Sequence, residues 1–385
     1  MAITPKQAED VLLYAPYGSC VVLLGKPGSA KSAVNYRAAK RAGATYCGKY
    51  TADMDVLDGK GIPYLIEGSD GKKIMAYAPT GDWPTDAAAS LYPKDSEIRV
   101  NLDDWGQSPP PVKRQTARAI YGDGTERLLG NNVILPNVLF SATSNSVEDR
   151  AGVFQTESYA QNRVVDVRVE PDVDEWVSGA ISGFPKPQFD ESYPEKRVAI
   201  NREVAKGVPD EIIAYAKWNK SVSNFEANTP GPFMSQRSLT ELGKFMRAFG
   251  AVGINGSILH EVACGTLGEA EAIKFIAFHA LRDQLPDTDA ILKGEDVRLP
   301  ARTEILYILC TAIVRAGRKE HCGAVAKLID KLAHTETTDG MKVGVEVSAY
   351  LFKECLHGAA SELRGVRSSP ILMKWLQEHG KYFIG

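Results

Sequence analysis

Short runs of consecutive apolar residues punctuate the first 170 positions of the chain. Four such runs predict strands, at residues 21–24, 98–102, 138–143 and 164–169. A continuous apolar run bounded by glycine or polar residues is typical of a strand buried on both faces of a parallel sheet. Segments of helical periodicity, such as residues 111–121, lie between these runs. The alternation predicts a layered α/β domain with a parallel sheet.

The pattern changes after residue 171. Residues 183–194 are rich in proline and aromatic residues without a clear period, and we expect a loop there. Apolar residues at helical spacing then predict helices at 209–220, 235–249, 268–281, 302–315, 319–332 and 343–357. The apolar positions within 305–313 fit either core packing or a partner-docking face. The chain is therefore expected to contain an α/β core followed by a helical half.

Charge and composition exclude several classes of protein. The 385 residues include 45 Lys and Arg against 48 Asp and Glu, which gives a net charge of −3. This balance argues against a generally basic nucleic-acid binder, and DNA translocation is disfavoured because no basic stripe is interleaved with aromatic residues. No stretch approaches the ~18 apolar residues of a membrane span, and the N-terminus lacks the pattern of a secretory signal. We therefore expect a cytoplasmic protein with no membrane contact.

Cysteine and histidine spacing gives no sign of a metal centre. No C-x-x-C pair occurs among the cysteines, so we expect reduced and mostly buried thiols in place of a metal cluster or a disulfide framework. The six histidines are equally dispersed, and we assign none of them a chemical role. The six cysteines are Cys20, Cys47, Cys264, Cys310, Cys322 and Cys355.

Residues 25–32, with the sequence GKPGSAKS, follow the first apolar run and precede a predicted helix at 33–42. A glycine-rich turn between strand and helix directs backbone N–H groups at a phosphate, while the lysine reaches the β- and γ-phosphates and the serine can bind Mg²⁺. Ala30 replaces the second fixed glycine of G-x-x-x-x-G-K-[ST], and its methyl group excludes backbone conformations open only to glycine. The alternative interpretation of residues 25–32 is a glycine-rich turn that follows a strand by chance and binds no phosphate. The expected phosphate-binding residues are Gly25, Pro27, Gly28, Ser29, Ala30, Lys31 and Ser32.

Polar residues close two further apolar runs. Asp103 and Asp104 follow the run that begins at residue 98, and Asn145 follows the third run. In phosphate-loop ATPases an aspartate in the first position holds Mg²⁺ together with the loop serine, here Ser32, and the next acidic residue activates the attacking water. Asp104 is one methylene shorter than the usual glutamate, so its carboxylate could lie too far back. An amide such as Asn145 could bind the water or the γ-phosphate.

Taken in order, these motifs resemble the MoxR-like branch of the AAA+ ATPases. The Ala-Lys-Ser ending of the loop is common in that branch, and the similarity covers roughly residues 10–290. The motifs that carry it are GKPGSAKS at 25–32, LDDWGQSPP at 102–110, SATSN at 141–145, EDRAGV at 148–153, QNRV at 161–164 and SQRS at 235–238.

The resemblance implies an AAA+ α/β nucleotide-binding core at residues 1–170, an all-helical lid at 171–283 and a C-terminal helical region at 284–385. It also implies a homo-oligomeric ring, typically a hexamer, with ATP and Mg²⁺ bound between neighbouring subunits. Asn145 would be the first sensor, Arg163 the arginine finger and Arg237 the second sensor. Arg150 is the alternative candidate for the arginine finger, and the sequence does not decide between Arg150 and Arg163.

Two predicted hairpins are candidate contact surfaces. One lies in residues 126–136 around Gly-Asn-Asn, and it fits either a simple edge hairpin or a surface that faces the pore or a partner. The other lies around residues 69–71 within the segment 53–83.

The resemblance favours an ATPase, hydrolysing ATP to ADP and phosphate, that acts as a remodelling or chaperone-like machine. A partner with a von Willebrand factor A domain is implied by the family alone. The alternative is a nucleotide-dependent scaffold or switch in which Asp104 supports only slow hydrolysis. A small-molecule phosphotransferase is disfavoured by the long helical half and by the arginine that follows a polar strand end.

Overall fold

The structure is a computed structural model, and it describes residues 2–122, 126–146, 157–219, 231–254, 256–339, 341–357 and 362–380. Arg150 and the motif at 148–153 lie outside the described residues. The chain divides into two compact units. Unit 1 comprises Met1–Gly207 and Phe225–Ile273, and unit 2 comprises Val208–Asn224 and Lys274–Gly385. Helix α11 (Glu269–His279) continues from the residues of unit 1 into those of unit 2.

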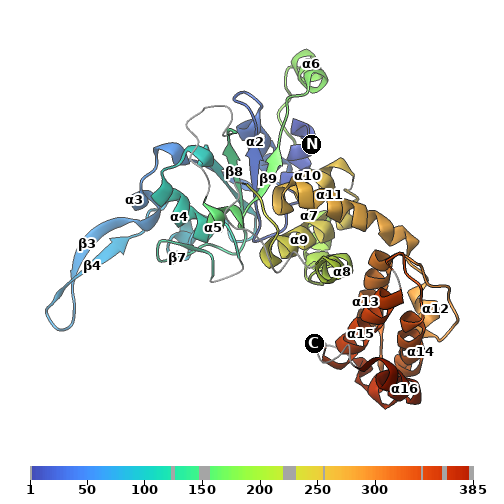
Figure 1. The fold of residues 1–385 in the computed structure, drawn as a ribbon. Helices are drawn as coiled ribbons and strands as arrows, with labels where there is room; N and C mark the ends of the chain where they lie inside the picture. Colours follow the sequence, from blue (N-terminus) through green and yellow to red (C-terminus); the bar gives the residue numbers. More distant parts are fainter. Residues whose placement is uncertain are drawn as a thin grey trace. The chain divides into compact units, whose positions relative to one another are not determined.

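A five-stranded parallel sheet forms the centre of unit 1 (Figure 1). Its strands, in spatial order, are β2 (Thr45–Tyr50), β5 (Ile98–Asp103), β8 (Val138–Ser144), β1 (Cys20–Leu24) and β9 (Val165–Arg168). Apolar residues on the central strands stack in register, with Val100 opposite Phe140 and Val22 opposite Ala142, and all four are buried. Because the strands are parallel, their carboxyl ends share one edge of the sheet, where polar residues from separate strands can meet.

Helices of unit 1 begin at recognisable capping signals. The Thr4 side chain and the Gln7 side chain form a reciprocal capping box at the start of α1, which also has Pro5 at its first position. Helix α10 packs so closely on β9 that a Cβ on Gly265 would lie 1.6 Å from the Asp166 carbonyl oxygen, so only glycine fits there. The helices of unit 1 are α1 (Pro5–Leu13), α2 (Lys31–Arg41), α3 (Val56–Lys60), α4 (Pro110–Ala119), α5 (Ser158–Gln161), α6 (Val173–Ser182), α7 (Tyr193–Val204), α9 (Gln236–Val252) and α10 (Ser257–Leu267).

Two antiparallel hairpins accompany the sheet. Strands β3 (Ile62–Glu67) and β4 (Lys73–Ala78) form a hairpin that extends away from the sheet (Figure 1), and strands β6 (Leu128–Leu129) and β7 (Asn132–Val133) form a shorter one. Both hairpins predicted from sequence are confirmed. Their turns contain Gly71 and Gly130 at positive φ, a conformation that glycine adopts at little cost.

Unit 2 is a helical domain with its own buried core. Its helices are α8 (Asp210–Trp218), α12 (Thr288–Leu292), α13 (Thr303–Ala316), α14 (Cys322–Ala333), α15 (Met341–His357) and α16 (Pro370–His379). The apolar face of α13 lies inside this core, where Leu306, Leu309 and Ile313 are fully buried. Of the two readings left open for residues 305–313, core packing is therefore the observed one. The chain also forms short 3₁₀ helices at Thr51–Asp53, Asp86–Leu91, Trp105–Gln107, Ala280–Gln284, Lys319–His321 and Glu362–Ser368.

The predicted architecture is confirmed: an α/β core with a parallel sheet precedes helical regions. The four predicted strands are four of the five in the sheet, and the loop at 183–194 lies almost entirely between α6 and α7. Sequence analysis missed strand β2 and helices α1, α3, α5, α6, α7, α10, α12 and α16. The division into core, lid and C-terminal region at residues 170 and 283 stays a prediction.

All six cysteines are free thiols, and burial raises the pKa of Cys20, Cys310 and Cys355. The helices described by the structure include none with the length and apolarity needed to cross a membrane.

Candidate nucleotide-binding site

The phosphate-binding loop joins β1 to α2 at the carboxyl edge of the sheet. A Cβ on Gly25 would lie 2.5 Å from the Val169 carbonyl oxygen, so close backbone approach requires glycine there. Gly28 has a φ of +84° and Ala30 a φ of +64° with ψ of 15°. Ala30 thus adopts the left-handed conformation, which costs an L-residue roughly 1–2 kcal/mol. The alanine at the second glycine position therefore permits the turn, at some cost in stability.

The N-terminus of α2 offers backbone donors to a ligand. Ala30 is the residue that caps this 11-residue helix, and its side chain has no oxygen to accept the first-turn N–H groups. Those donors, with the positive end of the helix dipole, form an anion-binding site. A bound anion can accept the hydrogen bonds of the first-turn N–H groups that a polar N-cap side chain would otherwise accept.

Lys31 is largely buried and holds its ammonium group within the loop. Its Nζ donates to the carbonyl oxygens of Gly25 at 2.8 Å and Lys26 at 3.0 Å, and to Oδ1 of Asn145 at 3.1 Å. Ser29 Oγ lies 3.4 Å from the same nitrogen. The structure therefore brings Lys31 and Asn145, two residues predicted from separate motifs, into direct contact.

Ser32 and Asp103 meet where a divalent cation would be expected. The Ser32 hydroxyl donates to Asp103 Oδ1 over 2.8 Å, and the Thr143 hydroxyl donates to the same oxygen over 2.6 Å. A hydroxyl and a carboxylate are oxygen ligands of the kind that Mg²⁺ prefers, usually with several waters retained. The donor set therefore fits Mg²⁺.

Asp104 lies beside Asp103 in a strained backbone conformation. Its φ is +53°, and its backbone N–H donates to Thr143 Oγ1 over 2.9 Å. Desolvation and the neighbouring Asp103 raise the pKa of Asp104, while a hydrogen bond from Tyr50 and the charge of Lys31 lower it. A raised pKa makes the carboxylate a better proton acceptor near neutral pH. Apart from glycines, positive φ in the described chain occurs at Ala30, Asp104 and Phe184, so two of these positions flank this site, as stored strain often does.

Sequence analysis missed the residue that organises these carboxylates. Thr143 on β8 both donates to Asp103 and accepts from Asp104, so it fixes the end of β5 against β8. Thr51 adds a second tether, because its hydroxyl donates to the Asp103 carbonyl oxygen over 2.9 Å. In the sequence, Thr143 is only a threonine two residues before Asn145. Because threonine is common in strands, nothing in the sequence distinguishes it from an ordinary strand residue.

Arg163 and Arg237 lie at the opposite edge of the sheet from the phosphate loop. Arg163 precedes β9, whose first residue Val165 pairs with Val21 near the amino end of β1, whereas the loop follows the carboxyl end. Five strand residues at about 3.3 Å each separate the two edges. Arg163 therefore lies apart from the phosphate-binding loop predicted in its own chain.

The two arginines share one cationic cluster. Desolvation and the charges of Arg237 and Arg118 lower the pKa of Arg163. The guanidinium of Arg237 lies 5.3 Å from the ring centre of Tyr121, and Lys244 Nζ lies 5.4 Å from the same ring. The cluster gathers positive charge around Tyr121, and Lys244 in it is also paired with Glu241 Oε2 at 3.5 Å.

The comparisons with known proteins found structural neighbours alone. No family model matches the chain, and no curated protein matches it. Among the solved structures, a crystal structure of a putative ATPase from Cytophaga hutchinsonii is similar over 72% of this chain and 90% of that chain, with 16% sequence identity and a TM-score of 0.47. The α/β fold of unit 1 is established by its own parallel sheet and by the turn between β1 and α2.

Proposed function

We propose that this chain is an ATP-binding and ATP-hydrolysing MoxR-like AAA+ ATPase. The observation that carries the proposal is the convergence of Lys31, Ser32, Asp103 and Asp104 around the uncapped first turn of α2. A triphosphate needs backbone donors, an ammonium group, a Mg²⁺ site and a carboxylate near the attacking water. Groups that could supply all four lie at one edge of the sheet.

In this mechanism the N–H groups of the loop and Lys31 bind the β- and γ-phosphates. Ser32 and Asp103 would hold Mg²⁺, which would supply positive charge to the phosphate oxygens. Asp104 accepts the proton of the attacking water, and Asn145 orients that water through its amide. Lys31 exchanges its bonds with loop carbonyls for phosphate oxygens, so the loop is organised around the ammonium group before ATP arrives.

The position of Arg163 supports a homo-oligomer, of which a hexameric ring is the form that the family resemblance suggests. A guanidinium at the amino edge of the sheet serves the γ-phosphate of an adjoining copy, where it stabilises charge that develops during transfer. Arg237 belongs to the same cluster, so its sensing role also concerns the adjoining nucleotide. Hydrolysis would then depend on assembly.

Exposed apolar surfaces in unit 1 support contacts with other protein chains. Helix α6 has no buried residue, and Trp176 and Ile181 on it are 63% and 83% exposed. The β3–β4 hairpin exposes further apolar side chains, among them Leu65 and Met75. Large contiguous apolar patches on a protein surface commonly mark sites of contact with other proteins or membranes. Remodelling of a protein client, with a partner that carries a von Willebrand factor A domain, is the activity that the family resemblance suggests for these surfaces.

A nucleotide-dependent scaffold with slow hydrolysis is the second candidate. It is favoured by Asp104, whose side chain is one methylene shorter than glutamate and whose left-handed backbone is tethered by its N–H to Thr143 Oγ1. Small misplacement of a catalytic group can lower a rate by about 100-fold. Steady-state turnover by the assembled protein separates the two candidates, because a motor hydrolyses ATP continuously and a scaffold does not.

The test of the proposal is a mass measurement with and without ATP, combined with an ATPase assay. We expect Lys31→Ala to abolish nucleotide binding, and Arg163→Ala to bind ATP without turnover. Lys40→Ala and Arg202→Ala, which change exposed residues on α2 and α7, are matched controls that should behave as the parent. Full turnover by Arg163→Ala would show that the finger is another residue, and Arg150 would be tested next.

A further inference from the structure

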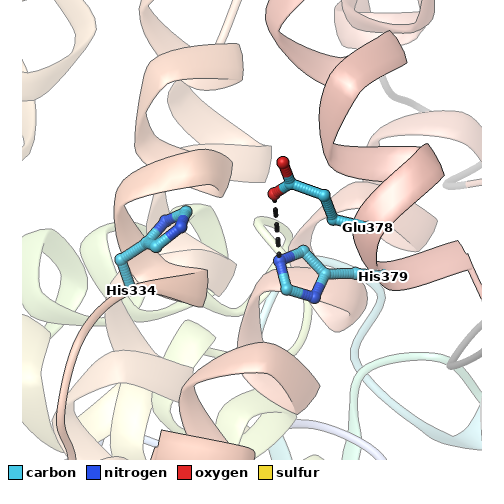
Figure 2. Close-up of side chains that lie close together, drawn as sticks. All are labelled: His334, Glu378 and His379. Atoms are coloured by element: carbon cyan, nitrogen blue, oxygen red, sulfur yellow. Dashed lines mark ion pairs between the residues drawn. The ribbon is translucent and has the colours of Figure 1, made fainter.

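A cluster of potential metal ligands lies in unit 2, remote in sequence from the nucleotide site. His334 directly follows α14, and Glu378 and His379 are the last two residues of α16. One ligand atom from each of the three side chains lies within 4.8 Å of the others (Figure 2). The arrangement joins the ends of two helices, and His334 and His379 are 45 residues apart in the sequence.

His334 is oriented as a metal ligand would be. Its Nδ1 lies 2.8 Å from the carbonyl oxygen of Asp330, so the Nδ1 proton is donated there. The Nε2 lone pair then remains available to a cation. Metal-binding histidines commonly use their second nitrogen in this manner, because the hydrogen bond fixes both the tautomer and the ring.

His379 has a nitrogen that the described residues leave unsatisfied. Its Nε2 is fully shielded from solvent and has no hydrogen-bond partner among the described residues. Glu378 Oε2 lies 3.9 Å away, too far for a hydrogen bond. The ring also packs against Trp375 at 5.6 Å between centroids, which limits its movement. A buried polar atom without a partner is costly, and a cation at this position would satisfy it.

The electrostatic setting favours positive charge. Helix α14 has 12 residues and α16 has 10, and both end at this cluster. Each helix presents its last carbonyl groups and the negative end of its dipole, which stabilises a nearby cation. Lys331 in the last turn of α14 is held by Asp296 and by the Val297 carbonyl oxygen, so its ammonium is already engaged.

We propose that His334, Glu378 and His379 bind a divalent transition-metal cation of the Zn²⁺ class. Two imidazole nitrogens and one carboxylate oxygen are three of the four ligands in a tetrahedral zinc site, and water fills the fourth position because His334 and Glu378 are exposed. Ligand atoms around tetrahedral zinc lie about 3.3 Å apart, a spacing that modest side-chain rotation supplies. Imidazole ligands disfavour Mg²⁺, so this site differs in chemistry from the nucleotide site.

The bound cation would act as a clamp between α14 and α16. Because it binds the folded protein and bridges separate helices, binding stabilises unit 2 by mass action. This role is independent of nucleotide, so the metal site stands or fails separately from the proposed ATPase.

The test uses the tag-free, full-length protein after chelator treatment. Calorimetric titration with Zn²⁺ is expected to give one site per chain, and titration with Co²⁺ to give the visible bands of a tetrahedral complex without sulfur charge transfer. His334→Gln and His379→Gln should each weaken binding at least about tenfold. His357→Gln, which changes a histidine at the end of α15, should bind as the parent does.

Circular dichroism and the unfolding midpoint in chelator show whether each variant is folded, and Glu378→Gln provides a third ligand variant with an isosteric side chain. We expect Zn²⁺ to raise the unfolding midpoint of the parent and of His357→Gln, but not that of the ligand variants. Failure of the parent to bind, unchanged binding by all three ligand variants, or sulfur charge transfer with Co²⁺ would overturn the proposal.

Discussion

At the scale of single residues, the site depends on backbone conformations that most side chains avoid. Ala30 and Asp104 both have left-handed backbone conformations. Ala30 directly precedes Lys31, and Asp104 directly precedes the turn that follows β5. Strain of this kind persists only where the surrounding structure enforces it. The strands and the helix around the loop supply that enforcement.

Ala30 provides a test of this strain. Ala30→Gly should raise the free energy of unfolding by up to about 1 kcal/mol, because relief of the left-handed cost exceeds the entropy gained by the unfolded chain. Ala33→Gly, on the exposed face of α2, should lower it by about 1 kcal/mol. Urea denaturation measures both values. A stability loss in Ala30→Gly equal to that in Ala33→Gly would show that the residue is not strained.

Asp166 gives a prediction about pH. Desolvation raises the pKa of this buried carboxyl from 3.8 to about 6. The native state therefore binds the proton more tightly than the unfolded chain, and the stability from that proton is present below about pH 4 and lost as the pH rises through about 6. A shift of this size corresponds to roughly 3 kcal/mol.

Asp166→Asn stays neutral at every pH and can still accept the hydrogen bond from Gln161. We expect it to be more stable than the parent at pH 8 and equally stable at pH 3.5, as measured by urea denaturation. Asp95→Asn changes an exposed carboxyl and should show no such difference. A pH-independent difference for Asp166→Asn would contradict the assignment.

At the scale of elements, β5 and β8 are tied together at their polar ends. Thr143 makes two hydrogen bonds that place Asp103 and Asp104 relative to the loop. Neither bond involves a ligand, so this tether exists before nucleotide binds. The register of the two strands thereby becomes part of the catalytic geometry.

Thr143→Val removes both hydrogen bonds and preserves the shape of the side chain. We expect turnover to fall by about 10- to 100-fold, as for other residues that position metal ligands. ATP binding measured without Mg²⁺ should be unchanged, because Lys31 and the loop remain. Thr143→Ser keeps the hydroxyl and should retain most of the activity. Equal turnover in the valine and serine variants would show that the tether does not matter.

Sequence analysis predicted the elements whose pattern is strong. Buried strands such as β1 and β5 are continuous apolar runs, and their positions were predicted closely. Edge strand β2 has the sequence TYCGKY and is only half-buried, so neither apolar run nor alternation identifies it. Helix α16 has ten residues, and its start was not recognised although Ser369 and Pro370 are residue types that favour a helix N-terminus.

The phosphate-binding residues were recognised because they are contiguous, and Asp103 and Asn145 because they end strands. The contacts of Asp103 with Thr143 and of Asn145 with Lys31 depend on the order of the strands in the sheet. The spacing of these residues along the sequence does not determine that order. The cluster of His334 with His379 was missed for the same reason, since helix packing brings together residues that no ligand motif links. Long-range juxtaposition is thus the part that the sequence left undetermined.

At the scale of the whole molecule, the two edges of the sheet carry different groups of candidate residues. Lys31, Ser32 and the two aspartates lie at the carboxyl edge, and Arg163 lies at the amino edge. Under the proposed function, a single copy could not bring them together, and complete active sites would form only where one copy meets another.

This arrangement predicts complementation between two inactive variants. Lys31→Ala lacks a working loop but keeps its arginine, and Arg163→Ala keeps its loop but lacks the arginine. When the two are mixed and allowed to exchange subunits, contacts between them create sites with both groups, so turnover should reappear. The recovered rate should rise and fall with the mixing ratio and reach its maximum near equal amounts.

The matched control mixes Lys31→Ala with the double variant Lys31→Ala/Arg163→Ala, in which no pairing restores a loop. That mixture should stay inactive at every ratio. If Arg163 instead served the nucleotide of its own chain, mixing Lys31→Ala with Arg163→Ala would also yield no activity, even when mass measurement shows mixed oligomers. The comparison therefore tests the split of the active site directly, because recovery requires a guanidinium from one copy and a phosphate loop from another.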